Sequence, residues 1–266
     1  MVKVSSQASD PGSSTRAVLF ESEDLAYYIT RDWPKTRQPR YFDVEDTTAA
    51  NILEENFERI RDEIVAYYEQ NTASFQPNFT PYAKAEAGWR TVNLYSYLLR
   101  YSKNCAKFPV TDEVVRKIPG MCLAQIGVLA PRTKLFAHFG DTNAVIRHHL
   151  GLVIPAGLPE VGIRVGRENR CWREGKVLAI SIAHRHFAWN QTDRYRIVLL
   201  VDVIRPELEP RKYEIARNAL AVITMKWFAT RFPVTKDLPR PLTAVFQRLL
   251  AAVFGLRLRV QRAFGV

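Results

Sequence analysis

The clearest pattern along the chain is a series of short apolar segments between about Trp89 and Val203. Pro, Gly, Asn or charged residues separate these segments, which read VNLYSYLL, MCLAQIGVL, HLGLVIP, VGIRVG, KVLAISI and YRIVLLVDV. Short apolar runs rich in β-branched and aromatic residues and bounded by turn residues are typical of β-strands. Many such strands without intervening helices predict a closed barrel or a sandwich.

Helical spacing precedes this stretch. Residues 46–69 predict one helix, whose apolar positions are Ile52, Leu53, Phe57, Ile60, Ile64 and Tyr67. Asp46, Thr47 or Thr48 is placed to cap its first turn, because a short polar side chain there accepts a hydrogen bond from a free backbone N–H.

Helical spacing returns after Arg205-Pro206. Residues 211–230 match a helix only loosely, whereas residues 241–262 carry a clear stripe made of Leu242, Val245, Phe246, Leu249, Leu250, Val253 and Phe254. The stripe predicts a helix that packs on the barrel or on a partner protein. A basic helix lying on a membrane surface is the alternative.

Composition places the chain among ordinary globular proteins. It has 266 residues, of which 47% are hydrophobic and 24% charged, and this is enough to bury one full core. Its three cysteines (Cys105, Cys122 and Cys171) have no ligand-like spacing, which argues against a disulfide framework or a zinc site.

The polar first residues do not resemble a signal peptide, and no uninterrupted apolar run reaches about 18 residues. We therefore expect a cytoplasmic protein without a spanning helix.

The net charge of +11 is concentrated in the last quarter of the chain. From Arg205 onward there are twelve Lys and Arg against four acidic residues, which accounts for +8 of the total. Nucleic-acid binding is not favoured, because the body lacks interleaved basic and aromatic residues. A basic tail of this kind fits a peripheral membrane surface or a partner protein, with residues 241–262 as the contact.

The histidines are the main chemical signal. All five lie between positions 138 and 186, inside the strand-rich stretch: His138, His148, His149, His184 and His186. The spacing does not fit a helical HxxxH zinc motif, and GxSxG, GxGxxG and P-loop motifs are absent. What remains is a non-haem iron pattern, in which two distant histidines meet in a barrel and an arginine secures a carboxylate cosubstrate. His186 and Arg196 fit this arrangement, on successive strands.

At these positions the sequence resembles the aspartyl/asparaginyl β-hydroxylase family. The resemblance runs from about Trp89 to Leu208, and its ordered elements are H-x-G-x-T-N, R-x-H-L-G-L-x-I-P, W-x-x-G-K, H-x-x-W-N/Q and R-x-x-x-x-x-D-x-x-x-P-E-L. Its strongest parts are HFGDTNAVIRHHLGLVIP (138–155), WREGKV (172–177) and HFAWNQTDRYRIVLLVDVIRPEL (186–208). The presence of all elements in order makes the resemblance specific.

The resemblance implies a mainly β fold, a double-stranded β-helix of the jelly-roll, cupin-like kind with flanking helices. It implies His138 and His186 as Fe(II) ligands. It also implies that Arg147, His149 and Arg196 contact the two carboxylates of 2-oxoglutarate. Gly140 stands where most such oxygenases carry a third, carboxylate ligand, so that Asp141 next to it is a weaker candidate ligand.

Four parts of the chain follow from this interpretation. We expect a disordered leader over 1–16, a helical and irregular cover over 17–88, the catalytic core over 89–208, and a basic helical extension over 209–266.

Two departures from the family pattern affect the site. Gly127 stands where the family usually has a serine that contacts the cosubstrate. The segment Ser181–Arg185 replaces an acidic stretch and brings in His184, which competes with His186 as a ligand. The spacing to Trp189 and Arg196 favours His186.

His148 alternates with His149 on a strand and should face the opposite way. Trp172 and Trp189 are interpreted as core aromatics.

The sequence thus predicts a dioxygenase that uses Fe(II), 2-oxoglutarate and O2 to hydroxylate an unactivated C–H bond of an amino-acid, peptidyl or related small-molecule substrate. Two alternatives stay open. One is a non-catalytic, cupin-like binding module with a basic docking tail. The other is an oxygenase of the same fold with another outcome, namely halogenation, cyclisation or hydroxylation of a lipid acyl chain.

Overall fold

The computed structural model of the chain describes residues 39–45, 47–78, 88–232, 235 and 238–264. The leader expected over 1–16 and the candidate cap Asp46 lie outside these residues. The strands are β1 (Tyr41–Phe42), β2 (Gln76–Pro77), β3 (Trp89–Ser96), β4 (Leu99–Arg100), β5 (Met121–Leu129), β6 (Thr133–Lys134), β7 (Val145–Val153), β8 (Val161–Val165), β9 (Glu168–Arg170), β10 (Val177–Ile180), β11 (His186–Asn190) and β12 (Arg196–Ile204).

Helices lie before, within and after this set of strands. They are α2 (Thr48–Glu55), α3 (Phe57–Gln70), η3 (Thr72–Ser74), α4 (Ser102–Cys105), α5 (Pro109–Arg116), η4 (Pro206–Arg211), α6 (Lys212–Arg231) and α7 (Arg240–Phe264).

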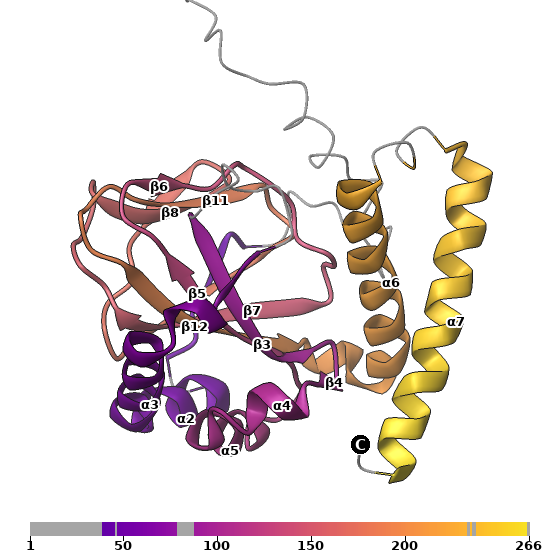
Figure 1. The fold of residues 1–266 in the computed structure, drawn as a ribbon, viewed down its shortest axis with the longest axis horizontal. Coiled ribbons are helices and arrows are strands. Elements are labelled where there is room, and N and C mark those ends of the chain that lie inside the picture. The colour runs from indigo at the N-terminus through magenta and orange to yellow at the C-terminus, as the bar shows by residue number, and fades with distance from the viewer. Residues whose placement is uncertain (1–38, 46, 79–87, 233–234, 236–237, 265–266) are drawn as a thin grey trace, which may run out of the picture.

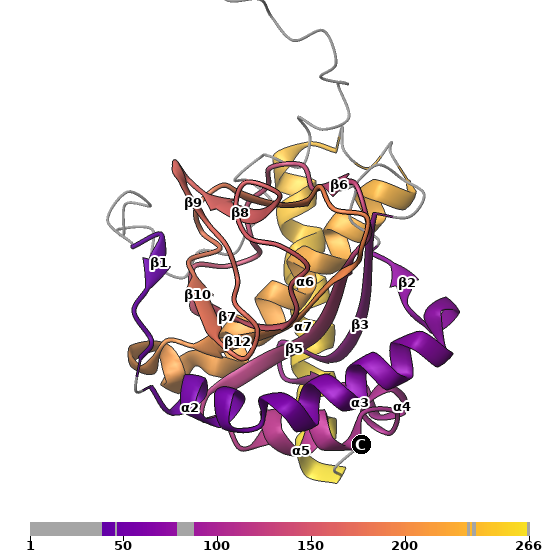
Figure 2. The same cartoon turned by 90° about the vertical axis from the view of Figure 1, so that its left-hand side faces the viewer.

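The strands form two facing antiparallel sheets. The larger has the order β1-β10-β7-β12-β5-β3-β2, with β4 beside β3, and the smaller has the order β6-β11-β8-β9. α2, α3, α4 and α5 cover the outer face of the larger sheet, while α6 and α7 stand at the side of the barrel (Figures 1 and 2). The mainly β, jelly-roll prediction is confirmed.

Side chains of the larger sheet alternate between the barrel interior and the helices. On β12, Val198 and Leu200 belong to the interior core, whereas Leu199 belongs to the core under the helices. Because Leu200 is the cross-strand partner of His149, the two side chains share the interior face. The period of two in the sequence therefore decides which polar groups enter the barrel.

The single helix predicted over residues 46–69 is wrong in one respect. The chain forms α2 and α3 with a break at Asn56, whose φ of −103° and ψ of 12° are not helical. The Asn56 side chain donates a hydrogen bond to the Ile52 carbonyl, so a local side-chain contact accompanies the break. The predicted cap at Thr47 is confirmed, because its hydroxyl accepts from the Ala50 N–H.

The prediction that no helix interrupts the strands is also wrong. α4 and α5 lie between β4 and β5, and α5 begins with Pro109 at its first turn, a position that proline favours. Val114 and Val115 of α5 are fully buried against the larger sheet. An eight-residue helix shows too few turns for its period to stand out in the sequence.

α6 and α7 differ in how they are buried. α6 lies between the barrel and α7 (Figure 1), and nine of its residues are buried. Because α6 buries residues on several sides, its sequence carries no single apolar stripe, which explains why the match over 211–230 is loose. α7 contacts the body over a narrow face, on which Ala251 and Leu258 are buried.

Candidate metal and carboxylate site

His138 and His186 lie next to each other although they are far apart in the sequence. Their backbones form an isolated antiparallel bridge, in which each N–H donates to the carbonyl of the other residue at 3.0 and 2.9 Å. The ring centroids are 4.4 Å apart, and both residues are buried. The bridge joins the segment before β7 to the start of β11 and brings the two imidazoles together.

The two imidazoles are oriented in the same way. His138 Nδ1 lies 2.8 Å from the Phe136 carbonyl oxygen, and His186 Nδ1 lies 2.8 Å from that of His184. A carbonyl only accepts, so Nδ1 carries the proton in both rings and Nε2 carries the lone pair. Backbone contacts of this kind fix the tautomer of metal-binding histidines.

Burial keeps both rings neutral. It lowers the pKa of His186 to about 4, and it holds the pKa of His138 well below its ordinary value, with the His186 ring as a second cause. Neutral imidazole is the form that binds metals. The pair is therefore ready to coordinate a cation at neutral pH.

A third protein ligand is excluded at Gly140 by packing. A Cβ atom built at Gly140 would lie 2.6 Å from Ile182 Cδ1, and the Gly140 N–H donates to the Ile182 carbonyl at 2.8 Å. Ile182 therefore fills the space that a carboxylate side chain would need.

Asp141 does not join the histidine pair. Its Oδ1 accepts a 2.7 Å hydrogen bond from Lys226 Nζ on α6, and Lys226 is buried. Among the described residues, no three His, Cys, Asp or Glu side chains are placed to hold a metal ion. A buried lysine thus neutralises the charge of Asp141, and a role of Asp141 as a ligand stays a prediction.

Arg196 and His149 present polar atoms that the folded protein does not satisfy. Arg196 Nε and His149 Nε2 are buried without a hydrogen-bond partner. His149 Nδ1 accepts from the Trp172 indole N–H at 3.0 Å, so Nε2 is the protonated nitrogen and points a donor into the protein. The Arg196 guanidinium lies 4.5 Å from the Trp172 ring centroid. One tryptophan thus supports both unsatisfied donors.

The charge on Arg196 has a high cost in this environment. Burial lowers its pKa to about 9, and a buried cation without an acidic partner is unfavourable by several kcal/mol. An anion with a carboxylate is the kind of group that removes this cost, since it accepts hydrogen bonds and neutralises the charge. The donors therefore fit a carboxylate ligand beside the two histidines.

Arg147 is placed differently. Its Nε and Nη2 donate to the two carboxylate oxygens of Asp202, both at 2.7 Å, and Asp202 is fully buried. Burial lowers the pKa of Arg147, but the Asp202 carboxylate more than offsets this, so that the net pKa is raised. A contact between Arg147 and the cosubstrate stays a prediction, because much of its guanidinium is taken up by Asp202.

Two other histidines have structural positions. His148 is buried (3% exposed) and shares its parity on β7 with Leu150, which belongs to the core under the helices. His184 offers its backbone carbonyl to His186 Nδ1, so it orients the neighbouring ring. It is His186, and not His184, that pairs with His138.

The glycine that replaces the family serine is explained by packing. A Cβ at Gly127 would lie 2.8 Å from Leu200 Cδ1. Leu200 therefore fills the space at this position, and a serine would need that leucine to move.

Three further residues hold side chains of the candidate site. Trp172 is buried in the core, as expected for a core aromatic, and its indole N–H also donates to His149. Asp202 and Lys226 neutralise Arg147 and Asp141. In the sequence, the feature that points to Asp202 is its position as the aspartate in the last element of the family pattern. Lys226 lies beyond that pattern, and only its burial in α6 reveals it.

Comparisons with known proteins agree with these motifs. The family model for aspartyl/asparaginyl beta-hydroxylase matches residues 54–206. The chain is 32% identical over 185 residues to an ornithine lipid ester-linked acyl 2-hydroxylase of Rhizobium tropici, a match that covers 68% of this chain and 66% of that protein. It is 32% identical over 171 residues to the human aspartyl/asparaginyl beta-hydroxylase, over 62% of this chain and 22% of that protein. The chain therefore spans less than two thirds of the length of these relatives.

Among solved structures, a prolyl-4-hydroxylase of Pseudomonas putida matches with a TM-score of 0.39 and 14% identity, over 56% of this chain and 86% of that one.

Proposed function

The chain belongs to the aspartyl/asparaginyl β-hydroxylase family, and we propose that it is an Fe(II)- and 2-oxoglutarate-dependent oxygenase that hydroxylates an unactivated C–H bond. One observation carries the proposal. Two buried, neutral imidazoles lie 4.4 Å apart, in a barrel whose interior also holds a buried arginine with an unsatisfied Nε. Structural packing alone gives no reason for that combination.

The histidine pair is the proposed iron site. His138 and His186 would hold Fe(II) through Nε2, the ring nitrogen that carries the lone pair when Nδ1 donates to a backbone carbonyl. Bound iron, together with 2-oxoglutarate, supplies the oxidising power by activating O2. Backbone carbonyls fix the two rings, and Lys226 holds the Asp141 carboxylate in an ion pair.

The unsatisfied donors are the proposed cosubstrate site. Arg196 would bind one carboxylate of 2-oxoglutarate, and His149 Nε2 would donate to the other, with Arg147 adding positive charge nearby. Trp172 positions both groups, through its N–H to His149 and its ring face under Arg196. A site built from rigid strands holds such contacts more precisely than one built from loops.

For the substrate, a lipid acyl chain has specific support beside a peptidyl or free amino acid. The Rhizobium tropici relative is named for acting on an acyl group, and its match covers more of this chain than that of the human enzyme. The segment Ser181–Arg185 also replaces the acidic stretch of the family pattern. Hydroxylation at an acyl carbon would use the same iron and cosubstrate groups.

The test is anaerobic titration of 2-oxoglutarate into the iron(II)-loaded chain, followed by exposure to air. We expect a visible charge-transfer band on titration, and succinate together with a product that gains one oxygen atom when an acyl lipid or an Asp/Asn peptide is supplied. His138→Ala and His186→Ala should abolish the band, whereas His148→Ala should keep it.

Three results would contradict the proposal. A chain that binds 2-oxoglutarate but never forms succinate with any substrate would be a binding module. Iron binding that survives in both His138→Ala and His186→Ala would place the metal elsewhere. A chlorinated product in place of a hydroxylated one would agree with the proposed metal site but would show that the reaction is halogenation.

A further inference from the structure

The outer face of α7 is an exposed apolar stripe. Its members are 42–75% exposed and recur at intervals of three or four residues, which places them on one side of the helix: Leu242, Val245, Leu249, Val253, Leu256, Val260 and Phe264. The sequence had grouped Phe246, Leu250 and Phe254 with this stripe, but these are half-buried toward the body. A continuous apolar surface of this kind marks an interaction site.

α7 is also long and apolar enough to cross a membrane, by length and composition. The candidate segment is Pro241–Phe264, and only 11% of its most apolar window is buried. Single arginines interrupt this segment, which is why the sequence shows no long uninterrupted apolar run although the average hydropathy is high.

Arginines border the stripe, and α7 contains no acidic residue. At 100° per residue, Arg248 and Arg259 lie along one edge of the stripe and Arg257 along the other. All three are exposed. An apolar face flanked by arginines, whose long side chains reach up to phosphate groups, is characteristic of helices in the plane of an anionic membrane.

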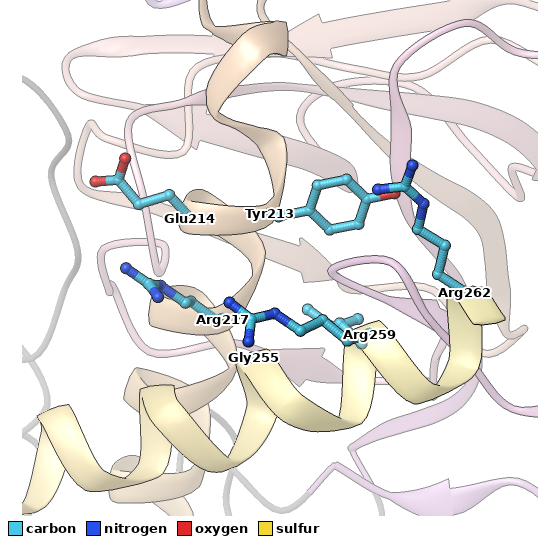
Figure 3. A pocket seen from close by; sticks show the side chains of 7 residues that line it. Tyr213, Glu214, Arg217, Gly255, Arg259 and Arg262 are labelled. Atoms are coloured by element: carbon cyan, nitrogen blue, oxygen red, sulfur yellow. The ribbon is translucent and has the colours of Figure 1, made fainter.

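A basic pocket lies along one of these edges. It is a cavity of 330 Å³ between α6 and α7, and its lining includes Tyr213, Arg217, Arg259 and Arg262 (Figure 3). Its acidic lining residue is Glu214, which accepts two hydrogen bonds from Arg211 at 2.7 and 2.9 Å. Three arginines therefore line a space whose carboxylate is engaged elsewhere, and arginine is a side chain that binds phosphate well.

The inner face of α7 is tied to the body. Gln261 donates to the Leu98 carbonyl at 2.8 Å and accepts from the Arg100 N–H at 3.0 Å, while Phe246 packs edge-on against Phe228 of α6 at 5.5 Å. A helix that crossed a bilayer would give up these contacts. A helix that lies on the surface keeps them.

We propose that the outer face of α7 docks this protein on an anionic phospholipid surface, with the helix in the membrane plane. The stripe enters the boundary between headgroups and acyl chains, and Arg217 and Arg259 contact lipid phosphates. A second copy of the chain fits this face poorly. Two stripes packed together would bring their bordering arginines close to each other, and α7 offers no acid to neutralise them. This inference does not rest on the proposed oxygenase reaction.

The test uses the intact chain without metal or substrate and two kinds of vesicle, phosphatidylcholine alone and phosphatidylcholine with phosphatidylglycerol. We expect flotation with the anionic vesicles and weaker binding at high salt. Leu249→Glu with Val253→Glu should lower the partition coefficient at least about tenfold, because two charges enter the apolar boundary. Arg217→Gln with Arg259→Gln should remove the preference for anionic vesicles.

Arg164→Gln with Arg167→Gln is the matched control. It changes the net charge by the same amount, and Arg164 lies on β8, on the far side of the barrel from α7 (Figure 1). Vesicle binding should stay as in the unchanged chain.

Several outcomes would overturn the proposal. One is no binding to either vesicle; another is an equal loss in the control. A third is a chain that forms a dimer and does not bind vesicles. If Leu249→Glu with Val253→Glu dissociates that dimer, the stripe is the contact between two copies. Protein that stays in the vesicles after a carbonate wash would show a spanning helix. None of these results bears on succinate formation, so the two proposals fail separately.

Discussion

Two arginines face the interior of the same barrel from neighbouring strands, and the protein treats them in opposite ways. Arg147 on β7 has a bidentate carboxylate partner, Asp202, on the adjacent strand. Arg196 on β12 lies over Trp172 and keeps a buried Nε without a partner. Both are cations removed from water, but only the first is neutralised by the fold itself.

The difference separates a charge that the fold neutralises from one that the fold leaves open to a ligand. The pair of Arg147 and Asp202 is complete without any ligand, so its loss should appear in the stability of the metal-free protein. The charge of Arg196 is tolerated at a cost, and this cost falls when an anion binds. Mutations at the two positions should therefore move stability and ligand binding in different directions.

The largest effect is expected for Arg147→Met. It leaves the Asp202 carboxylate buried and unpaired, and removing one partner of a buried ion pair costs about 3–5 kcal/mol. The measurement is the free energy of unfolding of the metal-free chain in denaturant. The double variant Arg147→Met with Asp202→Leu should recover most of the loss, and a loss below about 1 kcal/mol in the single variant would contradict the role of the pair.

Arg196→Met should separate binding from stability. We expect the affinity of the iron(II)-loaded chain for 2-oxoglutarate to fall by about 2 kcal/mol or more, roughly 30-fold, because a charged contact to a carboxylate is lost. The metal-free chain should be equally stable or more stable, since a buried cation is replaced by an apolar side chain of similar length. Anaerobic calorimetry and denaturant unfolding measure the two effects.

The control is Arg194→Met, two residues away on the surface, which should leave both quantities unchanged. A destabilised Arg196→Met variant with normal 2-oxoglutarate affinity would reverse the comparison, because Arg196 would then be the structural arginine.

The histidine pair extends the comparison to pH. The folded-state pKa of His186 is about 4, below its ordinary value of 6.5, so the unfolded chain binds more protons between these values. The contribution of neutral His186 to the free energy of unfolding is complete above pH 6.5. It falls by about 1.4 kcal/mol per pH unit as the pH drops toward 4. Unfolding of the metal-free chain across this range should show the slope, and His186→Gln should reduce it.

Trp172→Phe is expected to have the smallest effect. It keeps an aromatic ring under Arg196 but removes the indole N–H that donates to His149, a hydrogen bond worth about 1 kcal/mol. We expect 2-oxoglutarate affinity to fall about fivefold with little change in iron binding. Trp172→Leu, which also removes the ring, should lower the affinity further; equal effects in both would show that the N–H does not matter.

The sequence predicted those parts of the molecule that depend on the local pattern of apolar residues. The apolar segment Met121–Leu129 is β5 as observed, and the parity of His149 against His148 decides which of them enters the barrel. The meeting of His138 and His186 was expected from ordered motifs, because a resemblance carries tertiary information that spacing does not.

What the sequence could not predict depends on partners that are distant in the chain. Asp202 is in the same motif as Arg196, yet it neutralises Arg147 on another strand. The two sides of α7 have similar composition, so the side that faces α6 is known only when α6 is in place. α5 was missed because eight residues interrupt a strand-rich stretch without a strong period of their own.

The contact between Gly140 and Ile182 also limits how this site can evolve. A carboxylate at position 140 collides with the isoleucine, so a mutation of the glycine alone meets a steric penalty before it gains a ligand. Shortening Ile182 alone leaves a cavity with no benefit to the metal. A carboxylate at position 140 would therefore also need a smaller side chain at position 182, so in this chain the core itself opposes a third ligand at the proposed iron site.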